Sequence, residues 1–170
     1  YDNYALQGVN ISGLTEEAND IQPLTMGFGR YISGNEFSSG SPVAIIGYTN
    51  AENLFGSASL AIGKEIKIQD KKATIIGVIK KMGTTMIGQD YDQSIIISYR
   101  FARQIVNEDQ SSPKIIVQGK ENITSEALAD ELEGVMRSIR KLSPTQADNF
   151  TLNQISSFSE KVSSLFSNIN

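Results

Sequence analysis

The stretch that most constrains the fold runs from Val43 to Val78, with the sequence VAIIGYTNAENLFGSASLAIGKEIKIQDKKATIIGV. Its first residues, Val43–Gly47, form a short apolar run that is typical of a buried strand. A short helix is expected next, ending at Leu54-Phe55-Gly56, followed by a turn. Alternating apolar residues then predict two strands, Glu65–Gln69 and Ala73–Val78, joined by Asp70-Lys71-Lys72. A strand, a helix and two further strands in this order indicate a domain that mixes α and β structure.

Composition excludes several classes of function. The 170 residues contain no cysteine and no histidine, which removes disulfides, thiolate metal sites and catalysis through a histidine base. The net charge of −4 argues against nucleic-acid binding, which usually needs a basic face. We find neither an apolar run of about 20 residues, as a membrane span requires, nor a signal peptide. We therefore interpret the chain as a soluble piece of a longer protein; a complete cytoplasmic domain is the alternative.

The second half of the chain has the pattern of a βαβ unit. Ser94–Ser98 is a β-branched apolar run that predicts a buried strand. The clearest helix is Ser125–Leu142, capped by Thr124 or Ser125, with its apolar residues at steps of three and four. Lys114–Gly119 and Phe150–Leu152 are the expected strands on either side of it, so an α+β fold is predicted.

The segment Lys81–Gln93 is polar, contains glycine and reads as a mobile loop. Apolar side chains on a polar loop are adaptable contact groups, so the loop is the candidate partner contact. The alternative is that these side chains fold back onto the sheet. The acidic pair Asp90 and Asp92 lacks the further ligands of a calcium loop, and we interpret both as solvated charges. The candidate contact residues are Met82, Met86, Ile87 and Tyr91.

Two glycine-containing segments invite comparison with phosphate loops. Gly27-Phe28-Gly29-Arg30 lacks the third glycine of a dinucleotide motif and the Lys-Ser/Thr of a P-loop. Ile62-Gly63-Lys64 precedes a strand, so no helix N-terminus is available there for an anion. Structural turns are the simpler interpretation of both. No catalytic residue, cofactor site or metal site is predicted.

Taken together, three segments carry a family resemblance. The stretch from Val43 to Val78 resembles the extracytoplasmic domain of MacB/FtsX-like ABC-transporter permeases, where V-x-V-I-G, LFG, IGK-x-I-x-I and VIGV occur in this order. The run from Asp92 to Arg100 is similar to that family's D-x-x-I-I-I-P-Y strand, with Ser98 in place of the proline. The segment from Gly134 to Asn153 is similar to the part of the family that precedes the second membrane span.

The resemblance implies a MacB-like periplasmic core with two subdomains. Residues 1–22 and 98–152 would form a porter-like βαβ subdomain, its N-terminal part incomplete, and residues 23–97 a smaller inserted α/β subdomain. Residues 153–170 would form an amphipathic helix that leads to a membrane span. The residues expected to make this membrane connection are Phe158, Val162, Leu165 and Phe166.

The resemblance also implies a function without catalysis. The segment would lie on the periplasmic side of a bacterial inner membrane and transmit ATP-driven motion to a periplasmic adaptor or to cargo, in efflux or lipoprotein-type transport. The expected partners are a second permease copy, a cytoplasmic ATP-binding domain reached through the membrane helices, and the adaptor; no cofactor is expected. The alternatives are a free-standing ligand- or peptide-binding sensor domain and, from another class, a Ser–Lys hydrolase.

Overall fold

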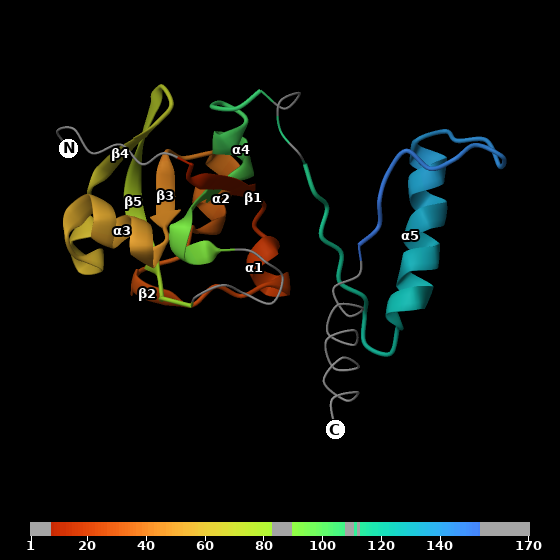
Figure 1. The fold of residues 1–170 in the computed structure, drawn as a ribbon, viewed down its shortest axis with the longest axis horizontal. Coiled ribbons are helices and arrows are strands. Elements are labelled where there is room, and N and C mark those ends of the chain that lie inside the picture. Colours follow the sequence, from red (N-terminus) through yellow and green to blue (C-terminus); the bar gives the residue numbers. More distant parts are fainter. Residues whose placement is uncertain (1–7, 83–89, 108–110, 112, 154–170) are drawn as a thin grey trace. The chain divides into compact units, whose positions relative to one another are not determined.

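The structure is a computed structural model that describes residues 8–82, 90–107, 111 and 113–153. The chain divides into two compact units, residues 1–116 and residues 117–170. The first unit is built on a mixed β-sheet with short helices on its faces (Figure 1). The second unit is built around one long helix (Figure 1).

The sheet of the first unit has the strand order β1-β6-β3-β5-β2, and β4 also pairs with β5. The pairs β1–β6 and β3–β5 are parallel, whereas β6–β3, β5–β2 and β5–β4 are antiparallel. β5 is long enough to hold β4 with its first half and β2 with its second half. The strands are β1 (Asn10–Leu14), β2 (Met26–Gly29), β3 (Val43–Ile46), β4 (Glu65–Ile68), β5 (Lys71–Ile79) and β6 (Ser94–Ser98).

Short helices connect these strands and cover both faces of the sheet. They are α1 (Ala18–Ile21), α2 (Gly34–Ser39), α3 (Tyr48–Phe55), α4 (Tyr99–Ala102) and the 3₁₀ helices η1 (Ala58–Ala61) and η2 (Tyr91–Gln93).

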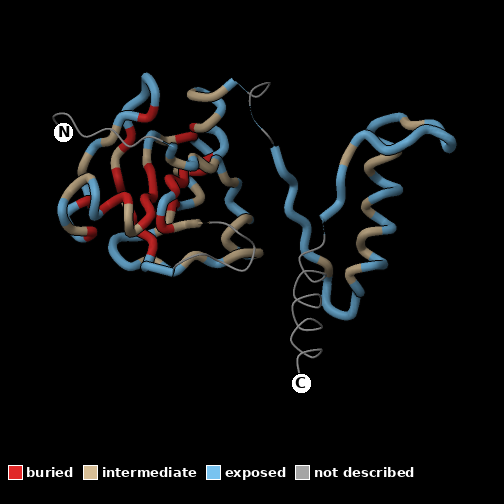
Figure 2. Tube along the Cα trace, viewed as in Figure 1, coloured by how far each residue is buried: buried red, intermediate tan, exposed pale blue. Residues whose placement is uncertain are grey.

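The core follows the two-residue period of the central strands. Ala44 and Ile46 of β3 pack with Ala51 of α3 on one face, while Ile45 packs with Phe37 of α2 on the other. Every residue of β6 is buried, because both faces of this strand are covered. Figure 2 shows the buried residues concentrated in the strands of the first unit. The continuous apolar runs in β3 and β6 are therefore explained by a sheet that is buried on two sides.

The segment Val43–Val78 forms the predicted strand, helix and pair of strands. β3 and α3 lie where expected, and Gly56 ends α3 in the left-handed conformation at φ 73°. β4 and β5 are the two predicted strands and pair as an antiparallel hairpin. The predicted link Asp70–Lys72 is too long, because Lys71 and Lys72 already belong to β5 and Ile68 pairs with Lys71 across a turn of Gln69 and Asp70. Gln69 itself has a φ of 51°, a conformation that the tight hairpin turn requires.

In the second unit, the helix α5 (Ser125–Ile139) is confirmed and ends three residues before the predicted limit at Leu142. The hydroxyl of Thr124 accepts the N–H of Ala127 at 3.2 Å, as expected of an N-cap. Beyond the helix, Lys141 adopts a φ of 53°. Arg137 then holds the following loop by donating to the carbonyl oxygens of Ser143 and Gln146 and to the carboxylate of Asp148.

The strands predicted over residues 114–119 and 150–152 are wrong, since neither segment pairs in a sheet among the described residues. A strand is stable only when a neighbour takes its backbone hydrogen bonds and covers its apolar side chains. Here Ile115 is 82% exposed, and its neighbours Ile116 and Val117 are each 44% exposed. The described part of the second unit contains no buried residue (Figure 2).

Directly after β6, the short helix α4 ends at Ala102. Gly40 ends α2 in the left-handed conformation, at φ 67°. The predicted subdomain limits at residues 22/23, 97/98 and 152/153 stay predictions.

Candidate functional site

The base of the predicted contact loop lies at one end of the sheet, between the end of β5 and the start of β6. Of the four candidate residues, the structure describes Met82 and Tyr91; Met86 and Ile87 lie outside the described residues. Met82 follows β5 and is 47% exposed, so its side chain is available for contact. Nearby, the ammonium group of Lys81 lies 5.5 Å from the ring centre of Tyr48, in cation–π range.

Tyr91, predicted as a contact residue on the loop, is half-buried against the sheet. It starts η2 and packs against the cluster that contains Ile45 and Ile96. Its hydroxyl donates to the side-chain oxygen of Gln22 at 3.3 Å, and burial raises its pKa. Met82 thus presents an apolar side chain to solvent, whereas Tyr91 helps to anchor the loop to the sheet.

The interpretation of both Asp90 and Asp92 as solvated charges is wrong for Asp92. Asp92 is only 5% exposed, and its carboxylate accepts the backbone N–H of Met82 at 3.0 Å. Asp90 caps η2 by accepting the N–H of Asp92 at 3.0 Å and the side-chain amide of Gln93 at 2.7 Å. The sequence signal that could have indicated this role is the position of Asp92 two residues before the strand Ser94–Ser98, whose centre is apolar.

The segment Gly27–Arg30 packs its backbone closely against β5 and does not form a phosphate-binding loop. A Cβ at Gly29, whose φ is 70°, would lie 2.2 Å from the carbonyl oxygen of Ile76. A Cβ at Gly77 would likewise lie 2.4 Å from the carbonyl oxygen of Arg30. Because only glycine lets the two backbones approach this closely, both positions fix the contact of the β2 end with β5.

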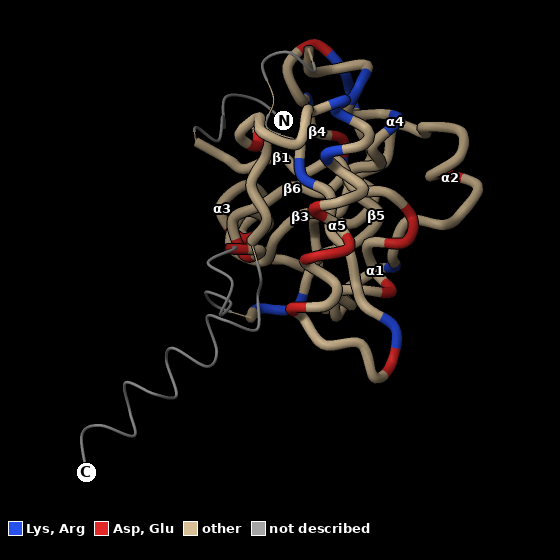
Figure 3. The backbone as a smooth tube through the Cα atoms, turned by 90° about the vertical axis from the view of Figure 1, so that its right-hand side faces the viewer, with Lys and Arg blue, Asp and Glu red and all other residues tan. Residues whose placement is uncertain are grey.

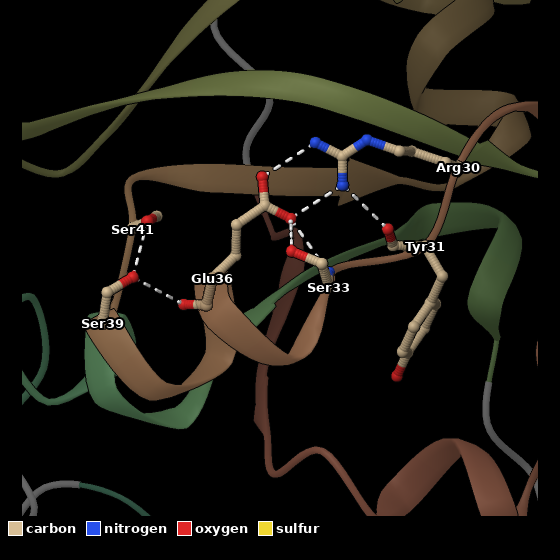
Figure 4. A network of polar contacts seen from close by, with 6 residues as sticks. All are labelled: Arg30, Tyr31, Ser33, Glu36, Ser39 and Ser41. Atoms are coloured by element: carbon tan, nitrogen blue, oxygen red, sulfur yellow. Dashed lines mark hydrogen bonds and ion pairs between the residues drawn. The ribbon is translucent and has the colours of Figure 1, made fainter.

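The Arg30 side chain donates to the Glu36 carboxylate through its two terminal nitrogens, Nη1 and Nη2, at 2.7 and 2.8 Å (Figure 4). Glu36 also accepts the backbone N–H of Ser33 at 2.9 Å and its hydroxyl at 2.8 Å. These hydrogen bonds, those from Arg30 first, lower the pKa of Glu36 to about 2. The network ties the end of β2 to the start of α2, with Ser39 and Ser41 hydrogen-bonded to each other at the far end of the helix (Figure 4).

The second glycine segment is a structural turn as well. Gly63 has a φ of 77°, and its N–H donates to the carbonyl oxygen of Ile75 at 2.8 Å. The N–H of Lys64 donates to Ala61 at 3.1 Å. These backbone donors are occupied within the protein, so they offer nothing to a phosphate group.

Within the described residues, no group of three or more acidic side chains could hold a metal ion. Charges of both signs occur along the described chain (Figure 3), and in α5 the acidic residues precede Arg137 in the last turn. None of the helices in the described part is long and apolar enough to cross a membrane. The predicted membrane connection at Phe158, Val162, Leu165 and Phe166 lies outside the described residues.

The geometry defines an α+β domain in which buried polar contacts and close glycine approaches fix the connections between elements. A family model described as the MacB-like periplasmic core domain matches residues 1–135. The chain belongs to this family, whose members are extracytoplasmic domains of ABC-transporter permeases. The resemblance and the α+β fold expected from the sequence are therefore confirmed.

Curated relatives agree with this assignment. The macrolide export ATP-binding/permease protein MacB of Rhodospirillum rubrum is 31% identical over 72 residues, which cover 42% of this chain. The pyoverdine export ATP-binding/permease protein PvdT of Pseudomonas aeruginosa is 35% identical over 74 residues, or 44% of this chain. In each case the match spans 11% of the relative's length.

A solved structure shares the fold. The periplasmic region of MacB from Actinobacillus actinomycetemcomitans matches 90% of this chain and 64% of its own length, with a TM-score of 0.67 and 13% sequence identity. At this identity the likeness shows the fold alone.

Proposed function

We propose that this chain is the periplasmic part of an ABC-transporter permease that transmits ATP-driven motion across the membrane to a periplasmic adaptor or to cargo. The observation that carries the proposal is the match of the MacB-like periplasmic core over residues 1–135. The domain itself is not an enzyme in this proposal; ATP is hydrolysed by a separate cytoplasmic ATP-binding domain. The relatives named as ATP-binding/permease proteins support this division of work.

A domain that transmits motion must be stiff, and the first unit has the features that stiffness requires. Its central strands β3 and β6 are buried on both faces, and interiors packed in this way resist deformation. The Arg30–Glu36 pair adds a charged, two-point link between the sheet and α2. Such a body would move as a unit when the membrane part moves.

In the proposal, the permease sits in a bacterial inner membrane and works with a second copy of itself. The helix over residues 153–170 would connect the domain to a membrane span through Phe158, Val162, Leu165 and Phe166. The loop around Met82, Met86, Ile87 and Tyr91 would contact the adaptor. The proposed class of transport, efflux or lipoprotein-type, follows from the family resemblance alone.

The test uses the full-length transporter that contains this chain, together with a purified periplasmic adaptor protein. Met82→Asp places a charge on the exposed loop base and is expected to weaken adaptor binding at least tenfold while ATP hydrolysis continues. Leu60→Asp is the matched control, since Leu60 is also exposed, at 59%, but lies on η1. Unchanged adaptor binding and transport in a folded Met82→Asp protein would contradict the proposed contact.

A parallel variant tests the membrane connection. Val162→Asp is expected to leave ATP hydrolysis in place and to abolish transport, because a charge on the apolar face of the connecting helix would disturb its packing. Normal transport by a stably folded Val162→Asp protein would remove that helix from the mechanism.

A further inference from the structure

The buried carboxylate of Asp92 is the least expected feature of the loop base. It lies in η2, two residues before β6, and reaches back across ten residues of sequence to the main chain at Met82. A buried carboxylate is costly unless hydrogen bonds compensate for the lost water. A backbone N–H is a strong donor for this purpose, and hydrogen bonds to a charged acceptor are stronger than those between neutral groups.

The chain on both sides of this contact is held firmly. Before Met82, the N–H of Lys80 donates to the carbonyl oxygen of Thr25 at 2.9 Å. On the other side, the hydroxyl of Ser94 donates to the carbonyl oxygen of Tyr91 at 2.9 Å. A Cβ at Gly47 would lie only 2.3 Å from that same oxygen, so the β3–α3 junction presses directly against η2. Asp92 therefore joins two fixed pieces of backbone at the point where the loop leaves the sheet.

We infer that Asp92 is the positioning residue of the Met82 contact surface, because its carboxylate holds the main chain from which the exposed Met82 side chain projects. This inference deepens the proposed function and rests on it for the role of Met82. The hydrogen bond between the Asp92 carboxylate and the Met82 N–H does not depend on any partner. Asp92 fixes the loop base, and a fixed contact group binds a partner without the cost of ordering it.

The first experiment measures amide hydrogen exchange of the 170-residue chain, resolved by residue. The Met82 amide is expected to exchange at least tenfold more slowly than an unprotected amide, although the Met82 side chain is exposed. Asp92→Ala is expected to speed exchange of the Met82 amide by about tenfold or more. The amides of Ile45 and Ile96 in the core are expected to stay protected. Asp70→Ala, the same substitution in the β4–β5 turn, is the control and leaves Met82 protected.

Asp92→Asn separates positioning from charge, because its amide oxygen can still accept the Met82 N–H. It is expected to retain most of the protection that Asp92→Ala loses. Fast exchange of Met82 in the unmodified chain would overturn the inference, and this measurement decides even where Asp92→Ala does not fold. Unchanged Met82 protection in a folded Asp92→Ala protein would overturn it as well.

The second experiment measures adaptor binding by the full-length transporter and separates this inference from the proposed function. Reduced binding with Asp92→Ala, restored by Asp92→Asn, supports the positioning role. Reduced binding with Met82→Asp but normal binding with Asp92→Ala overturns the positioning role and leaves the proposed function standing. Normal binding with Met82→Asp refutes the proposed contact, and the positioning role for that contact is refuted with it.

Discussion

The Arg30–Glu36 pair allows a quantitative prediction for Glu36→Gln, which removes the charge but keeps the shape of the side chain. A pKa lowered from 4.5 to about 2 would correspond to about 3 kcal/mol at full effect. However, the Arg30 side chain is 56% exposed, so solvent screens the pair. We therefore expect Glu36→Gln to lower the free energy of unfolding by about 1 to 2 kcal/mol at pH 7.

The pH dependence has a definite sign. Because the pKa of Glu36 is lower in the folded than in the unfolded chain, its contribution is present above pH 4.5 and is lost as the pH falls toward about 2. The difference between the unmodified chain and Glu36→Gln should therefore shrink as the pH is lowered through this window. Urea unfolding followed by circular dichroism, at a series of pH values, measures it.

The matched control is Glu65→Gln. Glu65 also pairs with a cation, Lys72 at 3.1 Å, but both side chains are largely exposed, at 60% and 73%. Exposed pairs of this kind contribute about 0 to 1 kcal/mol, so Glu65→Gln should have little effect. Equal losses for the two variants at pH 7, or a Glu36→Gln difference that does not change with pH, would refute the reasoning.

Two further predictions concern backbone fit and a buried phenol. Gly47→Ala should destabilise the first unit by more than about 2 kcal/mol in urea unfolding, because its Cβ would lie 2.3 Å from the carbonyl oxygen of Tyr91. In α5, a Cβ at Gly134 would meet no atom within 4 Å, so Gly134→Ala should stabilise the helix by about 1 kcal/mol. A similar loss for both alanine variants would contradict this explanation. Burial raises the pKa of Tyr31 to about 12, so ultraviolet titration should show a late tyrosine step that Tyr31→Phe removes, and stability should fall as the pH rises from 10 toward 12. Titration of every tyrosine near pH 10 in the folded chain would show that Tyr31 is not buried as described.

The sequence by itself determined the elements whose signals are local. The apolar runs of β3 and β6, the strands β4 and β5 and the capped helix α5 all follow from the side-chain period and from residues that end an element. The glycine turns at Gly29 and Gly63 were also correctly interpreted as structural. These features depend on neighbours within a few residues, and such neighbours are visible in the sequence.

Only the tertiary structure decided which elements meet. The order β1-β6-β3-β5-β2 brings distant strands together, and a local pattern carries no information on that pairing. The segment over residues 114–119 has the composition of a strand, yet it is not one here because a strand also needs a partner for its backbone. By sequence, Asp92 looks like a solvated charge in a loop, yet it is buried in the folded protein. A carboxylate is costly to bury without hydrogen bonds, and here the N–H of Met82, ten residues away, supplies one.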